Sequence, residues 1–127
     1  MKLNQVTVIA RDYDASVAFY RALGLMQFVA APPHYARFEC ADGAAFSLHL
    51  DEAGQPGATV VYFELDDLGG AVAPLKPEGL TFFQEPQEER WLWREARLRD
   101  PAGNVICLYH AGENRRFPPW RLQEPGG

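Results

Sequence analysis

The feature that most constrains this chain is a repeat, because its second half follows the same order of elements as its first. Val6–Phe28 aligns with Val61–Phe83, and the match sets Asp12 against Asp67. Each copy runs strand, acidic residue, helix, glycine and then further strands. The shared order carries more weight than the few identities. It predicts two modules of the same fold within one chain.

The first copy shows one helical segment among strands. Asp14–Leu23 is predicted to be a helix because its apolar residues recur on one face, with Asp12 or Asp14 as the N-cap and Gly24 as the left-handed stop. The remaining segments have strand character and are separated by turn residues. The predicted strands of this copy are Val6–Ala10, Leu25–Ala30, Ala36–Cys40 and Ala45–Leu50.

The second copy repeats the pattern with a weaker helix. Asp67–Lys76 contains Gly69, Gly70 and Pro74, so we expect a short helix that is broken at the proline. The last two strands are joined by a turn with the sequence DPAGN, in which proline presets φ and glycine takes the left-handed position. The predicted strands are Val60–Leu65, Thr81–Gln84, Trp91–Arg99 and Val105–His110.

These elements predict an α+β fold made of two βαβββ modules. The modules cover about residues 1–52 and 58–111 and form a single domain, 1–111, with an acidic, glycine-containing linker between them. Their sheets are expected to pair into an open, barrel-like mixed sheet with a central cleft. Residues 112–127 are rich in proline and glycine and read as an irregular C-terminal tail.

Charge and composition exclude several classes of function. The net charge of −5 argues against a nucleic-acid partner, and no apolar run is long enough to span a bilayer. The N-terminus reads as a strand and not as a secretory signal. Cys40 and Cys107 have neither CxxC spacing nor the density of a disulfide scaffold. We therefore expect a cytoplasmic protein with two reduced thiols.

Strand alternation predicts which side chains line the cleft. The helices need an apolar sheet face, so Phe46, Leu48, Ile106 and Leu108 are expected under them. The opposite face is expected to be a small-molecule pocket, although the same pattern fits the inside of a closed barrel. The pocket is favoured because Gln5, His49 and Glu64 would be costly to bury without partners. The predicted ligand-binding residues are Gln5, Thr7, His49, Tyr62, Glu64, Trp91, Trp93, Cys107 and Tyr109.

Two motifs resemble a known superfamily. Val6–Leu25, VTVIARDYDASVAFYRALGL, resembles the opening strand and "D…S…FYr..LGl" helix of the vicinal oxygen chelate superfamily, which includes glyoxalase I, bleomycin-resistance proteins and extradiol dioxygenases. Arg94–Leu108 is similar to its closing "reF.vrDPdGn..el" hairpin. The similarity covers most of the chain. It implies the paired-module fold and, commonly, a homodimer, although both halves could close on each other within one chain.

The resemblance also implies where a divalent metal would be held. The ligand positions fall on Gln5, His49, Val60 and Cys107, and Glu64 could replace Val60. An ungapped alignment of the two hairpins instead sets Ser47 against Cys107. Val60 has no donor atom, and a thiolate suits Mg²⁺ and Mn²⁺ poorly. We therefore expect no cofactor, with a metal at Gln5, His49 and either Glu64 or Cys107 as the alternative.

Two classes of function remain open. The first is a metal-independent protein that binds an aromatic or antibiotic-like compound, as the bleomycin-resistance branch does. The second is a metal-dependent, glyoxalase-like lyase or isomerase, or a thiol transferase. In an enzyme, His49 and Glu64 are the candidate catalytic residues, and Cys107 is a weaker candidate nucleophile. The tail either closes over the pocket or the partner subunit, or covers the core of its own chain.

Overall fold

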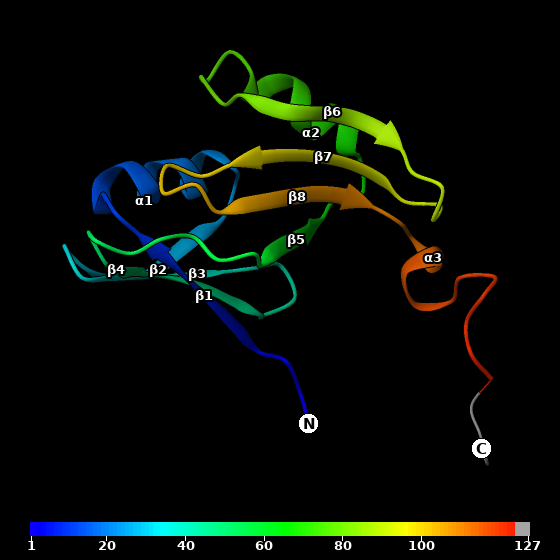
Figure 1. The fold of residues 1–127 in the computed structure, drawn as a ribbon, viewed down its shortest axis with the longest axis horizontal. Helices are drawn as coiled ribbons and strands as arrows, with labels where there is room; N and C mark the ends of the chain where they lie inside the picture. The colour runs from blue at the N-terminus through cyan, green and yellow to red at the C-terminus, as the bar shows by residue number, and fades with distance from the viewer. Residues whose placement is uncertain (124–127) are drawn as a thin grey trace.

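The computed structural model describes residues 1–123 and confirms the predicted α+β fold of two βαβββ modules (Figure 1). The first module forms a four-stranded sheet, here called sheet A, in the order β1-β4-β3-β2. The second forms sheet B, in the order β5-β8-β7-β6. In each sheet the first strand pairs in parallel with the last, and the other pairs are antiparallel. The sheets are separate and open.

The bounds of the elements follow the sequence prediction closely in the first module. Its elements are β1 (Gln5–Ala10), α1 (Tyr13–Ala22), β2 (Met26–Ala31), β3 (Tyr35–Glu39) and β4 (Ala45–Leu50). Asp12 is the N-cap of α1, where its side chain accepts from the Ala15 amide at 3.1 Å. Gly24 follows the helix with a positive φ of 105°, so a left-handed residue ends the helix as predicted.

The second module departs from the prediction at two places. Its elements are β5 (Val60–Glu64), α2 (Leu68–Val72), the 3₁₀-helix η1 (Ala73–Leu75), β6 (Phe82–Glu88), β7 (Arg94–Arg99), β8 (Val105–His110) and α3 (Glu113–Arg116). The helix is short, and Pro74 lies in η1, as expected of a glycine-rich segment with a proline. Two bounds differ: β6 continues to Glu88, beyond the predicted end at Gln84, and the predicted strand Trp91–Arg99 begins only at Arg94.

The turn between β6 and β7 explains the late start of β7. The Glu89 amide donates to the Trp93 carbonyl at 2.7 Å, and the Leu92 amide donates to the Glu89 carbonyl at 3.0 Å. Leu92 lies in the left-handed region, with φ of 70°. Tryptophan favours strands, but here the position of the hairpin between two paired strands overrides that preference.

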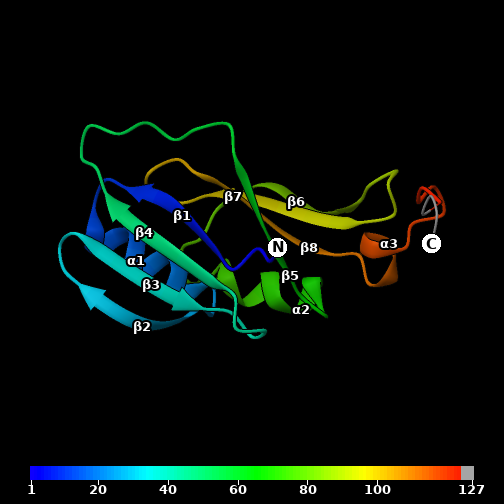
Figure 2. The same cartoon turned by 90° about the horizontal axis from the view of Figure 1, so that it is seen from below.

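A single hydrophobic core joins the two modules. Phe38, Phe46 and Leu48 of sheet A and Leu98, Ile106 and Leu108 of sheet B belong to the same buried cluster. Helix α1 lies against sheet A and reaches the β7–β8 turn (Figures 1 and 2). There the Tyr20 hydroxyl donates to buried Asp100, and the Asn104 amide donates to the Ile9 carbonyl at 2.9 Å.

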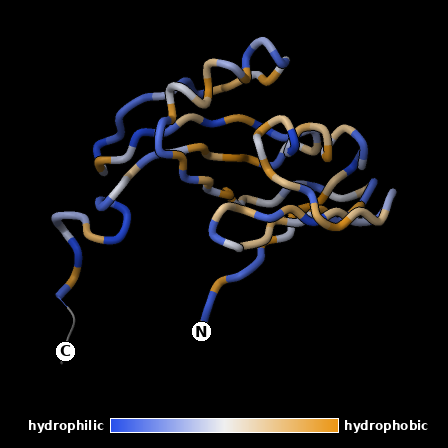
Figure 3. The backbone as a smooth tube through the Cα atoms, turned by 180° about the vertical axis from the view of Figure 1, so that it is seen from behind, coloured by the Kyte–Doolittle hydropathy of each residue, from blue (hydrophilic) through white to orange (hydrophobic). Residues whose placement is uncertain are grey.

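The hydropathy of the chain agrees with this arrangement. Hydrophobic stretches lie along the strands and helices in the middle of the molecule, and the segment after β8 is mostly hydrophilic (Figure 3). Because the helix-facing sides of both sheets meet in one core, the opposite sides remain for other roles. Those opposite sides carry the predicted ligand-binding residues.

Candidate functional site

The open face of sheet A carries a connected set of polar side chains. The Gln5 side-chain amide donates to the Ser47 hydroxyl at 3.2 Å and to the Tyr35 hydroxyl at 3.5 Å. Ser47 is fully buried and also hydrogen-bonds Thr7 at 2.7 Å. Arg37 on the neighbouring strand donates its Nε–H to the Tyr35 hydroxyl at 2.8 Å. This face therefore holds its polar groups in fixed positions.

The open face of sheet B is aromatic. Trp93 and Tyr109 stack with ring centroids 4.7 Å apart and an interplanar angle of 18°. Tyr62 meets both rings edge-on, at 6.0 Å from Trp93 and 5.7 Å from Tyr109. Tyr109 is buried, whereas Tyr62 is 44% exposed and available to a ligand. The guanidinium carbon of Arg97 lies 5.7 Å from the Tyr62 ring, which adds a cation–π contact.

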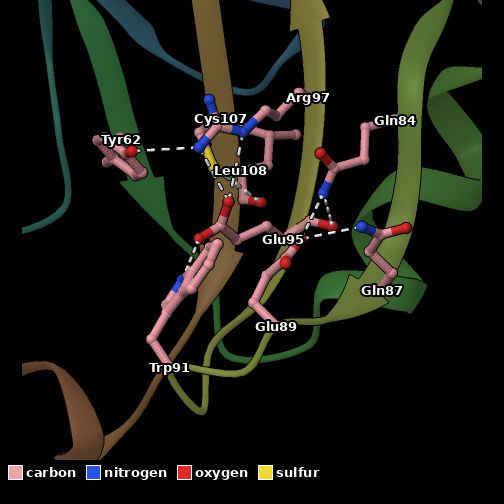
Figure 4. A network of polar contacts seen from close by, with 9 residues as sticks. All are labelled: Tyr62, Gln84, Gln87, Glu89, Trp91, Glu95, Arg97, Cys107 and Leu108. Atoms are coloured by element: carbon pink, nitrogen blue, oxygen red, sulfur yellow. Dashed lines mark hydrogen bonds and ion pairs between the residues drawn. The ribbon is translucent and has the colours of Figure 1, made fainter.

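Beside these rings lies a buried carboxylate, Glu95 (Figure 4). Its side chain accepts from the Trp91 indole N–H at 2.7 Å and from an Arg97 Nη at 3.0 Å. The same Arg97 nitrogen donates to the Tyr62 hydroxyl at 3.2 Å. Trp91 belongs to the turn and not to the strand, yet its indole still reaches this face. Glu95 is 1% exposed, so Arg97 and Trp91 compensate a charge that would otherwise be costly to bury.

Cys107 lies fully buried on the same face. Burial raises the pKa of the Cys107 thiol to about 12, and the nearby Glu95 carboxylate adds to this shift. The thiol therefore remains protonated at neutral pH. Since the thiolate is both the nucleophile and the metal ligand, this environment disfavours either role.

Strand register relates the two faces residue by residue. Arg37 lies opposite Ser47 in sheet A, and Arg97 lies opposite Cys107 in sheet B. Ser47, and not His49, is thus the counterpart of Cys107. His49 lies opposite Ile9 and is exposed at the end of its strand.

The donor set fits a divalent metal poorly. By this register the four positions implied by the family are Gln5, Ser47, Val60 and Cys107, which offer one amide, one hydroxyl, one apolar side chain and one protonated thiol. Within residues 1–123 no group of three or more His, Cys, Asp or Glu side chains is placed to hold a metal ion. These residues supply neither the carboxylates that Mg²⁺ prefers nor the imidazole and thiolate that Zn²⁺ prefers.

Glu64 has a local structural partner. Its carboxylate accepts from the backbone amides of Ala111 at 2.9 Å and Gly112 at 3.1 Å, where the chain leaves β8. His110 lies beside it and contacts the Leu65 carbonyl at 2.8 Å. The carboxylate thus fixes the backbone at the start of α3. His49, the other predicted catalytic residue, is on sheet A, whereas Glu64 is on sheet B.

Sequence reasoning missed Tyr35 and Arg37. The signal that could have found them was the alternation in Tyr35–Glu39, which puts both on the face of Ser47 once the β3–β4 register is known. That register depends on the Asp42-Gly43 turn. The alternation in Arg94–Arg99 also puts Glu95 and Arg97 on one face, but only the structure shows their ion pair.

A single chain does not enclose these faces. One open hollow, of about 420 Å³, lies at the start of α1, and another, of about 400 Å³, runs along α1 beside the β7–β8 turn. Neither includes any of the predicted ligand-binding residues. The predicted pocket is thus two exposed sheet faces in one chain.

Two βαβββ modules that share one core and leave both other sheet faces open define the paired-module class of α+β proteins. The chain belongs to the Glyoxalase/Bleomycin resistance protein/Dioxygenase superfamily, whose family model matches residues 2–108. This confirms the resemblance seen in the sequence. No curated protein sequence matches the chain.

Solved structures with the same fold carry different activities. A bleomycin-binding protein in complex with bleomycin has 21% identity and a TM-score of 0.69, and the match covers 87% of this chain and 98% of that one. Lactoylglutathione lyase from Agrobacterium tumefaciens has 20% identity and a TM-score of 0.74, with 95% and 97% covered. A glyoxalase/bleomycin resistance protein/dioxygenase from Nocardioides has 23% identity and a TM-score of 0.71, with 100% and 89% covered. These likenesses show the fold.

Two further observations concern the chain as a whole. None of the helices in residues 1–123 combines the length and the apolar character needed to cross a membrane. Cys40 and Cys107 are both free thiols, as the sequence predicted.

Proposed function

We propose that the protein binds an aromatic, antibiotic-like small molecule without a metal ion. The observation that carries this proposal is the aromatic cluster of Tyr62, Trp93 and Tyr109 on the open face of sheet B. Its rings are held in place by mutual contacts, and Tyr62 remains accessible. A preorganised aromatic surface beside a few oriented polar groups suits a planar ligand.

The proposal includes a second copy of the chain. Each open face in one chain leaves aromatic side chains exposed, among them Phe28 at 52% and Tyr62 at 44%. In a homodimer, sheet A of one copy can face sheet B of the other and form a cleft between them. In the segment that follows β8, Phe117 and Trp120 are more than half exposed, so they are available to pack on the partner. We expect a dimer by light scattering, and a strictly monomeric protein would contradict this part.

The donor set described above supports metal independence. The alternative is a metal-dependent, glyoxalase-like lyase or isomerase, or a thiol transferase, using Gln5 and His49. Metal analysis of the purified protein separates the two. Stoichiometric Zn²⁺, Ni²⁺ or Mn²⁺ that is lost in Gln5→Ala would overturn metal independence. We further propose a cytoplasmic location, in which both thiols stay reduced.

Binding is tested by thermal shift with bleomycin, a panel of aromatic antibiotics, glutathione conjugates and naphthalene-2-carboxamide. A ligand that binds only the folded state raises the melting temperature. Tyr62→Ala should weaken binding of any hit by about tenfold or more, since a stacking contact is lost. The matched control is Phe83→Ala, which removes another exposed aromatic residue from β6. Equal losses in both variants, or no hit at all, would contradict the proposal.

A further inference from the structure

Arg37 is a cation on the open face of sheet A without an acidic partner. It is half-buried in β3, and within residues 1–123 no carboxylate lies within ion-pair distance of it. Its Nε–H is used by the Tyr35 hydroxyl at 2.8 Å. A guanidinium has five N–H donors. Within residues 1–123, the four Nη hydrogens of Arg37 have no hydrogen-bond acceptor.

The equivalent arginine of sheet B is neutralised. Arg97 pairs with Glu95 at 3.0 Å, and Glu95 lies opposite Tyr109 in the strand register. In sheet A the register position of Glu95 is taken by Tyr35, which lies opposite His49. Both arginines are charged, but the one in sheet B has a carboxylate partner and the one in sheet A has none among the described residues.

Tyr35 adds a second donor beside Arg37. Its hydroxyl oxygen accepts from Arg37 and, at 3.5 Å, from Gln5, so the hydroxyl hydrogen is directed away from both. Burial raises the pKa of Tyr35, but hydrogen bonds with Ser47, Arg37 and Gln5 and the Arg37 charge outweigh burial, and the net pKa is lowered. A more acidic phenol is a stronger hydrogen-bond donor toward an anion.

The guanidinium also has aromatic neighbours. Its central carbon lies 5.7 Å from the Phe28 ring and 5.4 Å from the Tyr35 ring. These contacts fix the orientation of the fork and place exposed aromatic surface beside it. A fixed, uncompensated fork matches the two oxygens of a carboxylate.

We propose that Arg37 and Tyr35 form an anion subsite that binds the carboxylate of an aromatic acid. This inference rests on the proposed binding function and narrows its ligand class to aromatic carboxylates. The Nη groups of Arg37 hold the carboxylate, and Tyr35 donates a further hydrogen bond. The aromatic body of the ligand lies along the neighbouring Phe28 and Tyr35 rings.

The test compares two probes of the same shape, naphthalene-2-carboxylate and naphthalene-2-carboxamide, by isothermal titration calorimetry at low salt. Wild type should bind the carboxylate about tenfold or more tightly than the amide, as for a charge-assisted hydrogen bond. Arg37→Gln should abolish this preference while retaining affinity for the amide, and Tyr35→Phe should reduce it. Arg37→Lys keeps the positive charge but not the planar fork, so it should retain part of the preference for the carboxylate probe.

Arg99→Gln is the matched control. Arg99 is exposed and, like Arg37, lies over a phenylalanine ring, that of Phe83 at 5.2 Å, but it donates to the Gly103 carbonyl at the β7–β8 turn. This variant should keep the wild-type preference. Equal binding of both probes by wild type, or a preference that survives Arg37→Gln, would overturn the subsite and leave aromatic binding intact. Failure of both probes to bind wild type would overturn the proposed function as well.

Discussion

At the scale of single residues, environment decides chemistry more than residue type does. Cys107 lies at one of the metal-ligand positions that the family resemblance implies, and its surroundings hold the thiol in the neutral form. Glu95, one strand away, carries the negative charge of this face and is compensated by Arg97 and Trp91. Sheet B thus has a carboxylate close to Cys107, but this carboxylate is occupied by contacts with Arg97 and Trp91.

Cys107 is predicted to be unreactive in the folded protein. Its pKa of about 12 lies above the ordinary value of 9.0, so the thiolate fraction is very small at pH 8 and rises only as the pH approaches 12. Ellman's reagent at pH 8 should therefore modify at most Cys40 in the native protein, and both thiols in denaturant. Rapid modification of Cys107 in native Cys40→Ser would contradict this prediction.

At the scale of elements, the second helix is the weakest part of the fold. Helix α2 has five residues, two of them glycine, and its N-cap is the Asp67 carboxylate, which accepts from the Gly70 amide at 3.0 Å. The two glycines differ in their surroundings. A Cβ at Gly69 would meet nothing within 4 Å, whereas a Cβ at Gly70 would collide with the Asp67 carboxylate.

Gly69→Ala is predicted to stabilise the protein by about 0.5–1 kcal/mol, because alanine favours the helix and restricts the unfolded chain. Gly70→Ala should give no such gain, since the side chain of Asp67 must move and the cap is lost. Urea unfolding of the two variants, compared with wild type, measures the difference. A larger gain from Gly70→Ala than from Gly69→Ala would show that the cap is unimportant.

Most elements could be predicted from the sequence because they obey local rules. Asp12, Gly24 and the DPAGN turn mark boundaries that the structure retains. The start of β7 could not be predicted, because Trp91 and Trp93 suit a strand and only pairing with β6 shows that a turn lies there. The hydrogen bond of Arg37 to Tyr35 could not be predicted either. Nor could the absence of a carboxylate beside Arg37 among the described residues, because both depend on the register between strands.

At the scale of the whole molecule, the two modules form one cooperative unit. Their helix-facing sides share a core, and Tyr20 and Asn104 connect α1 and β1 with the β7–β8 turn. Because the sheets are separate, the two modules could unfold independently. The core residues that both modules contribute argue against this.

A single unfolding transition is therefore predicted. All three tryptophans, Trp91, Trp93 and Trp120, follow the linker, so their fluorescence reports the second module and the chain after it, whereas far-ultraviolet circular dichroism reports both modules. The two signals should give the same midpoint in urea. Midpoints that differ beyond experimental error would show that the modules unfold independently.

The equivalence of Arg37 and Arg97 has a consequence for the history of such a chain. Two modules of the same fold in one chain can diverge independently, because a substitution on one open face leaves the other untouched. The equivalent position holds Tyr35 in one module and Glu95 in the other, and only the glutamate supplies a carboxylate to its neighbouring arginine. A chain with two such modules can therefore keep the fold in both halves while the open face of one half changes the ligand that it prefers.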